Sequence, residues 1–201
     1  MKKKILNIPC VILSGGQSKR MGCDKALMTF TNNQTTIEYI HQKLSTIFQD
    51  VYISSKNDKF HNLQLQNKKL ILDTQDIHSP MIALQSIFNT IKSDKVFIIS
   101  VDIPLISKDA IVKLIEISNK NQCDITIAKD TDGNIHSLCG VFNRSILPLI
   151  EKLLDEDIHK INYMIKKTAN FEEVLIQNSQ QFLNLNTQTT YKEAQNIVNT
   201  L

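Results

Sequence analysis

Short apolar runs rich in isoleucine and valine alternate along this chain with longer segments in which apolar residues recur every three or four positions. Strands that are buried on both faces appear in a sequence as continuous apolar runs, and parallel strands need a covering segment, usually a helix, between them. The alternation therefore predicts an α/β fold with three layers (α/β/α), in which helices cover both faces of a Rossmann-like, mostly parallel sheet.

The apolar runs predict strands over residues 9–14, 51–55, 70–72, 96–100 and 124–128. Helices are expected over about residues 36–47, 81–91, 108–118, 145–154, 159–167 and 188–198, and another apolar run covers residues 171–176. The sequence contains no internal repeat and no linker rich in proline, glycine or serine. Because single domains cluster near ~100 to 150 residues, we expect residues 1–201 to form one domain.

Charge and composition narrow the class of protein. The net charge of +3 is spread along the chain, which does not favour nucleic acid binding but suits a small anionic substrate. No apolar run approaches the roughly 18 residues of a membrane helix, and Asn7 and Pro9 interrupt a start that imitates a secretory signal. The cysteines are too far apart to suggest a zinc site or a disulfide framework: Cys10, Cys23, Cys123 and Cys139. We therefore expect a soluble cytoplasmic protein with neither nucleic acid nor membrane as a partner.

A glycine-rich loop follows the first expected strand and reads Leu13-Ser-Gly-Gly-Gln-Ser-Lys-Arg-Met-Gly-Cys-Asp-Lys25. Glycine permits positive φ and close backbone approach, so these N–H groups can face an anion at the carboxyl edge of the sheet. The loop contains neither G-x-x-x-x-G-K-[ST] nor G-x-G-x-x-G, which argues against both familiar phosphate loops. The alternative is a tight turn with solvated lysines.

The same run resembles the signature L-x-G-G-x-S-x-R-M-G-x-D-K of the nucleotidyltransferases that attach a nucleotide to the molybdenum cofactor, and in particular their guanine-using branch. Three further segments are similar to that family. Leu70–Asp73 matches its strand ending in an aspartate that contacts the nucleotide, Ser100–Pro104 matches its metal-binding C-D-x-P segment, and Asn184–Thr187 matches its N-x-N-T motif.

The resemblance implies an enzyme with the nucleotidyltransferase fold that joins GMP from GTP to the terminal phosphate of molybdopterin, with or without molybdenum. The products are molybdopterin guanine dinucleotide and pyrophosphate, and Mg²⁺ is the implied cofactor. It also implies a monomer that delivers its product to maturation proteins of molybdoenzymes. The implied catalytic residues are Lys25, Arg20 and Asp102, of which Asp102 holds the metal. The implied nucleotide contacts are Leu13, Ser14, Gly15, Gly16, Lys25, Ser54, Asp73 and Asp102, and the implied substrate contacts are Asn184 and Asn186.

Charge chemistry gives these residues their expected roles. Nucleotidyl transfer places negative charge on the α-phosphate and on pyrophosphate, so we expect Lys25 near the former and Arg20 with the glycine amides near the latter. Lys19 is expected to be a solvated neighbour. Asp102 follows the buried run "VFIIS" and can hold Mg²⁺ with phosphate oxygens and water, or it can serve as a turn or helix cap.

The acceptor phosphate has a second pKa of about 6, so no general base is needed and the five histidines require no catalytic role. His136 is the exception, because its loop "DGNIHSL" is expected to face the substrate. Asp73 can accept hydrogen bonds from a ribose or a guanine edge, or it can cap a helix or a loop. A strand period of two would place Asn184 and Asn186 on one face, with a turn as the other interpretation for Asn184.

Some positions differ from the family pattern. Ser79-Pro80-Met81-Ile82-Ala83 stands where Gly-Pro-Leu-x-Gly is common, Ser54 replaces an asparagine, and His136-Ser137 replaces a His-Pro pair. A related nucleotidyltransferase that uses CTP or a sugar phosphate is therefore an alternative. A nucleotide-binding module without catalysis is a second one.

Overall fold

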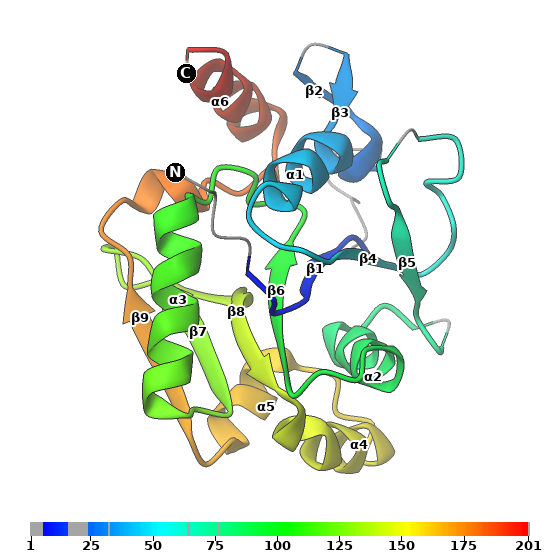
Figure 1. The fold of residues 1–201 in the computed structure, drawn as a ribbon, viewed down its shortest axis with the longest axis vertical. Coiled ribbons are helices and arrows are strands. Elements are labelled where there is room, and N and C mark those ends of the chain that lie inside the picture. The colour runs from blue at the N-terminus through cyan, green and yellow to red at the C-terminus, as the bar shows by residue number, and fades with distance from the viewer. Residues whose placement is uncertain (1–5, 16–23, 32, 64, 76, 201) are drawn as a thin grey trace.

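The computed structural model describes residues 6–15, 24–31, 33–63, 65–75 and 77–200. Within these residues, seven strands form one sheet in the order β5-β4-β1-β6-β8-β7-β9 (Figure 1). Their bounds are β1 Cys10–Leu13, β4 Val51–Ser55, β5 Lys69–Leu72, β6 Lys95–Ser100, β7 Ile125–Lys129, β8 Ile135–Asn143 and β9 Phe171–Leu175.

The sheet is mostly parallel, as the sequence predicts. β1 lies between β4 and β6 and is parallel to both, and β4 and β5 as well as β7 and β9 are also parallel. The exception is β8, which runs antiparallel to β6 on one side and to β7 on the other. β8 was not predicted, and its beginning lies in the segment that was expected to be a loop.

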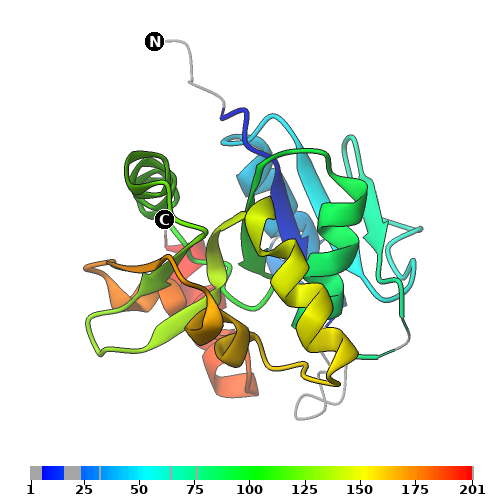
Figure 2. The same ribbon diagram turned by 90° about the horizontal axis from the view of Figure 1, so that it is seen from below.

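Helices cover both faces of the sheet, which confirms the three-layer prediction. Alternate residues of β1 point to opposite faces. Cys10 and Ile12 pack in the same apolar cluster as α1 (Thr36–Ser45) and α3 (Lys108–Asn121). Val11 and Leu13 pack with α2 (Pro80–Thr90), α4 (Leu147–Asp155) and α5 (Ile161–Lys167). Figure 2 shows α2 and α4 side by side on that second face. None of the described helices is long and apolar enough to span a membrane.

Capping side chains explain where three of these helices begin. The Thr35 hydroxyl accepts from the backbone of Glu38, whose carboxylate accepts in turn from Thr35 N–H, so a reciprocal capping box starts α1. Ser79 caps α2 just before Pro80, a residue suited to the first helical position, and Ser107 caps α3.

A small hairpin and the last helix form a separate packing unit beside the main sheet (Figure 1). The hairpin consists of β2 (Thr29–Thr31) and β3 (Gln34–Thr35), and the helix is α6 (Gln188–Asn199). The rings of Phe30 and Tyr191 meet edge to face with centroids 5.6 Å apart, and Leu185 is fully buried beside them. The Tyr191 hydroxyl donates to the Met28 carbonyl over 3.1 Å. These contacts hold the segment before α6 against the region that follows the glycine-rich loop.

Candidate functional site

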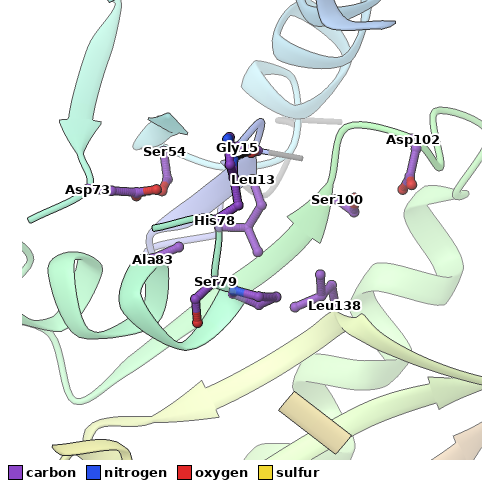
Figure 3. A pocket seen from close by; sticks show the side chains of 11 residues that line it. Leu13, Gly15, Ser54, Asp73, His78, Ser79, Ala83, Ser100, Asp102 and Leu138 are labelled. Atoms are coloured by element: carbon purple, nitrogen blue, oxygen red, sulfur yellow. Dashed lines mark hydrogen bonds between the residues drawn. The ribbon is translucent and has the colours of Figure 1, made fainter. Parts of the chain in front are cut away.

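A pocket of about 340 Å³ lies at the carboxyl edge of β1, β4, β5 and β6. Figure 3 shows Ser54 and Asp73 on one side of this pocket and Ser100 and Asp102 on the other. The pocket is lined by residues from the strand ends, from the start of α2 and from β8: Leu13, Gly15, Ser54, Asp73, His78, Ser79, Pro80, Ala83, Ser100, Asp102 and Leu138. Ligands of open α/β sheets bind at this edge, beyond the carboxyl ends of the strands.

At one end of the pocket, Ser54 and Asp73 form a hydrogen-bonded pair. The Ser54 hydroxyl donates to Asp73 Oδ1 over 3.3 Å, and Asp73 N–H donates to the Ser55 carbonyl over 3.1 Å. Burial raises the pKa of the Asp73 carboxyl, although the Ser54 hydrogen bond and the nearby His78 and Lys56 act in the opposite direction. Ser54 therefore orients a carboxylate that has spare acceptor capacity toward the pocket.

Of the glycine-rich loop, the structure describes Leu13, Ser14 and Gly15 at one end and Asp24 and Lys25 at the other. Gly15 does not adopt positive φ, and an added Cβ atom would make only an ordinary van der Waals contact with the protein, so close approach of its backbone to a ligand stays a prediction. A Cβ atom at Gly15 would lie 3.5 Å from Asp73 Oδ2, on the pocket wall. The Ser14 side chain is buried, its N–H donates to the Ser54 carbonyl over 2.8 Å, and its carbonyl accepts from Lys59 Nζ over 2.8 Å, so Ser14 is bound within the protein. The expected site residues Gly16 and Arg20 lie outside the described residues.

At the other end of the pocket, three predicted site residues from distant segments meet. Lys25 begins a short 3₁₀ helix, η1 (Lys25–Leu27), and its ammonium donates to Asn186 Oδ1 over 2.7 Å. The same nitrogen lies 3.8 Å from Asp102 Oδ2. The side chains of Lys25 and Asp102 are only 14% and 22% exposed, so their charges are partly shielded from water. This arrangement places one cation next to one carboxylate at the mouth of the pocket.

The C-terminal segment reaches this position through a backbone contact. Leu185 N–H donates to the Asp102 carbonyl over 2.9 Å. The strand expected at residues 184–186 does not form: Asn186 N–H donates to the Asn184 carbonyl over 2.7 Å, in a tight turn. Asn184 thus has the turn role that the sequence left open, and its Oδ1 atom is buried without a hydrogen-bond partner among the described residues.

Sequence reasoning missed His78, which it treated as a core or surface histidine. His78 Nδ1 lies 2.8 Å from the Gly15 carbonyl, which can only accept, so this nitrogen carries a proton. His78 Nε2 lies 3.4 Å from the Lys56 ammonium. The one available signal was its position immediately before Ser79, where the chain begins to differ from the Gly-Pro-Leu-x-Gly pattern of the family.

Lys43 was also missed, and no sequence signal indicated it. Its ammonium donates to the Pro104 carbonyl over 2.9 Å, so α1 holds the turn that follows Asp102. Burial lowers the pKa of Lys43 to about 8.

His136 does not line the pocket. Its Nε2 atom lies 2.9 Å from Asp130 Oδ2, and its ring stacks on Phe182 with centroids 3.9 Å apart. These contacts hold His136 at the start of β8, next to the turn that follows β7, in place of the expected exposure to substrate.

A divalent metal fits the chemistry of Asp102. No cluster of three or more His, Cys, Asp or Glu side chains exists among the described residues, so the protein does not offer a complete metal cage there. Mg²⁺ does not need one, because it commonly binds one or two carboxylates together with substrate phosphates and water. The partly exposed Asp102 carboxylate at the pocket mouth suits that mode of binding.

Comparison with protein families agrees with this geometry. Residues 10–171 match the model of the MobA-like NTP transferase domain. The chain belongs to the MobA-like NTP transferase family. The resemblance noted in the sequence is thereby confirmed, as is the enzyme class, a nucleotidyltransferase.

Named relatives of this MobA-like chain are similar over nearly their whole length. A molybdenum cofactor guanylyltransferase from Campylobacter jejuni subsp. doylei is 36% identical over 186 residues, which cover 92% of this chain and 93% of the relative. A molybdenum cofactor guanylyltransferase from Helicobacter pylori is 29% identical and covers 98% of this chain and 97% of the relative.

A solved structure supports the fold. The molybdopterin-guanine dinucleotide biosynthesis protein A from Archaeoglobus fulgidus superposes with a TM-score of 0.81 at 17% identity, covering 96% of this chain and all of that chain. The predicted α/β/α nucleotidyltransferase fold is confirmed.

Proposed function

We propose that this protein transfers GMP from GTP to the terminal phosphate of molybdopterin or of its molybdenum-loaded form. The reaction releases pyrophosphate and yields molybdopterin guanine dinucleotide. The convergence of Lys25, Asp102 and Asn186 at the mouth of a pocket whose far end holds Asp73 carries this proposal. The names of the Campylobacter and Helicobacter relatives favour guanylyl transfer over other nucleotidyl transfers.

The nucleotide spans the pocket in this proposal. The Asp73 carboxylate, oriented by Ser54, accepts hydrogen bonds from the ribose or the guanine edge. Leu13 and Gly15 form the wall between the two ends. On the resemblance alone, Gly16 and Arg20 complete the contacts to the departing pyrophosphate.

The main task of the site in this reaction is to stabilise the negative charge that develops on the phosphates. An oxygen of the acceptor phosphate forms a bond to the α-phosphorus of GTP, while the bond to pyrophosphate breaks and its electron pair leaves with pyrophosphate. The acceptor is already ionised near neutral pH, so no side chain has to remove a proton. The Lys25 ammonium, held by Asn186, balances the charge that develops on the α-phosphate. Mg²⁺, when bound, would add positive charge beside the phosphates, with Asp102 as its protein ligand.

The proposal includes the wider expectations from the sequence. Residues 1–201 act as one domain and as a monomer in the cytoplasm, and the product passes to maturation proteins of molybdoenzymes. The buried free thiols Cys10, Cys123 and Cys139 are consistent with a reducing compartment.

Nucleotide preference and two substitutions test the reaction. The purified protein, with molybdopterin and Mg²⁺, is expected to release pyrophosphate fastest with GTP among GTP, CTP, ATP and UTP. Lys25→Ala is expected to lower turnover at least tenfold, since one charge-stabilising contact is worth a few kcal/mol. Asp102→Ala is expected to abolish metal-dependent turnover, whereas Lys92→Ala, at an exposed position, leaves it unchanged.

Three outcomes would overturn the proposal. A strong preference for CTP would assign the protein to cytidylyl transfer. Tight GTP binding without pyrophosphate release would make it a binding module. Unchanged kinetics in Lys25→Ala would remove the assigned role of that residue.

A further inference from the structure

One ammonium group contacts both described ends of the glycine-rich loop. Lys59 Nζ donates to the Ser14 carbonyl over 2.8 Å and lies 2.5 Å from Asp24 Oδ2. Ser14 follows β1, and Asp24 directly precedes Lys25. The Lys59 ammonium therefore links the residue that follows β1 to the residue that precedes Lys25.

Lys59 is itself held firmly. It lies in the connection between β4 and β5, next to Phe60, which is fully buried. Its ammonium lies 5.2 Å from the centroid of the Phe60 ring, and its side chain is 19% exposed. A partly shielded ammonium that bridges a carboxylate and a carbonyl forms stronger hydrogen bonds than a solvated one.

Asp24 connects Lys59 to the short helix that carries Lys25. While Oδ2 contacts Lys59, the second carboxylate oxygen, Oδ1, accepts from the Ala26 N–H over 3.0 Å and caps η1. Lys25 is the first residue of η1, and its ammonium reaches Asn186 and Asp102. A displacement of Asp24 would therefore move the backbone from which Lys25 extends.

We propose that Lys59 is a positioning residue for nucleotidyl transfer. Its ammonium fixes the end of β1 and the start of η1 relative to one another, so that Lys25 and the Gly15 backbone keep their places at the pocket. Lys59 touches no reacting atom. The inference rests on the proposed function, but its effect on nucleotide binding can be measured without the transfer reaction.

The chain offers a closely matched control in Lys68. Its ammonium also donates to a backbone carbonyl, that of Phe60, over 3.1 Å, and it also lies near a carboxylate, Asp58, at 3.8 Å. Lys68 lies in the same connection between β4 and β5. Among the described residues, the Lys68 ammonium contacts Phe60 and Asp58 and reaches neither Ser14 nor Asp24. Loss of charge and of a carbonyl contact is thus common to Lys59→Met and Lys68→Met, and only the first disturbs the loop ends.

The experiment measures GTP affinity by calorimetry and the kcat and KM of GMP transfer for both variants. Lys59→Met is expected to weaken GTP binding and to lower kcat/KM at least tenfold, whereas Lys68→Met stays within about twofold of the wild type. Lys59→Arg, which keeps a cation with several donors, is expected to recover most of the lost affinity. Equal effects of Lys59→Met and Lys68→Met would overturn the proposal.

A double-mutant cycle tests the route through Asp24. Asp24→Asn keeps an oxygen that can cap η1 but removes the charge that faces Lys59. If the two residues act together, the double variant is expected to lose little more affinity than Lys59→Met alone. Additive losses would contradict the proposal, and so would an unchanged GTP affinity in a Lys59→Met variant of lower thermal stability. If the wild type binds GTP but transfers no GMP, the proposed function fails while the affinity cycle still decides the role of Lys59.

Discussion

Lys25 and Asn186 lie 161 positions apart in the chain, yet the Lys25 ammonium donates to Asn186 Oδ1 over 2.7 Å. The neighbouring residue, Leu185, is fully buried and donates its N–H to the Asp102 carbonyl, which holds Asn186 close to Lys25. The C-terminal segment therefore packs against both the lysine and the aspartate of the pocket mouth. This segment is therefore part of the candidate site.

Removal of this amide should slow the reaction without unfolding the protein. Asn186→Ala is expected to lower the kcat of GMP transfer by about tenfold, because a hydrogen bond to a charged group is worth about 1.5 to 3 kcal/mol and Asn186 is partly solvated. Steady-state kinetics check this, with the exposed Asn196→Ala on α6 as a control. A kcat equal to that of the control would show that Asn186 does not hold Lys25 during turnover.

The charged Asp73 carboxylate is expected to lower the stability of the fold while it contributes to GTP binding. Burial raises its pKa above the ordinary value of 3.8, so the folded state favours the protonated form and the charged form costs stability. That cost is fully present at neutral pH and disappears as the pH falls through the raised pKa toward 3.8. Asp73→Asn is therefore expected to raise the melting temperature at pH 8, by less at pH 4, and to weaken GTP binding about tenfold, as expected for loss of a charged acceptor.

Thermal melts at the two pH values and calorimetry with GTP measure both effects, and the exposed Asp132→Asn serves as the control. A lower melting temperature at pH 8, or an unaltered affinity for GTP, would contradict this assignment of Asp73.

Much of the fold could be predicted because apolar runs and helix caps are local signals. β1, β4 and β6 were expected almost to the residue, since strands buried on both faces appear in the sequence as apolar runs rich in Ile and Val. β8 was not expected. Its first half, Ile135–Leu138, is partly exposed and includes polar side chains, and Gly140 interrupts the apolar half. The turn residue Gly133 and the helix cap Asn143, which bound this segment, were the signals that could have found it.

Site residues that stand in a sequence motif could be predicted. Contacts between residues of distant segments could not. Lys25, Asp102 and Asn186 stand in recognisable motifs, so the sequence named them, but it could not show that they touch. Lys59 contributes through a single ammonium that crosses from another connection, and that contact depends on tertiary packing. No local pattern distinguishes Lys59 from the other lysines of the chain.

The turn between β7 and β8 should depend on the charge of Asp130. Asp130 Oδ1 accepts from the N–H groups of Asp132 and Asn134, and Oδ2 accepts from the Asn134 side chain and His136. Burial alone would raise the pKa of Asp130, but the hydrogen bonds from Asn134 and His136 outweigh it and lower the pKa to about 2. A lowered pKa means that the ionised form stabilises the fold above the ordinary value of 3.8, and that this stability is lost as the pH falls toward 2.

Asp130→Asn is accordingly expected to reduce the free energy of unfolding at pH 7 by about 2 kcal/mol, from a pKa difference of somewhat under two units at ~1.4 kcal/mol each. Urea unfolding at several pH values checks the size and the pH dependence. The difference between variant and wild type should shrink below about pH 4. A difference that stays constant down to pH 3 would mean that packing, and not charge, accounts for the effect.

Gly140 offers a test of the antiparallel strand that the sequence did not predict. A Cβ atom there would overlap the Thr126 carbonyl oxygen and lie 2.9 Å from Ile127 Cα, both backbone atoms of β7. Neither can move aside without breaking the β7–β8 pairing, whose register already shifts between Ile127 and Ala128. Gly140→Ala is therefore expected to cost about 3 kcal/mol, at the upper end of the usual range for overpacking.

For a chain of this size such a loss lowers the melting temperature by about 6 to 12 °C. Gly133→Ala separates crowding from backbone strain, because Gly133 has a positive φ of 86° but no atom within 4 Å of its added Cβ. It is expected to cost about 1 kcal/mol, the usual penalty for a left-handed alanine. Melting curves of the two variants compare these costs directly. If Gly133→Ala proved as damaging as Gly140→Ala, close approach of β7 to β8 would not be the reason that position 140 is a glycine.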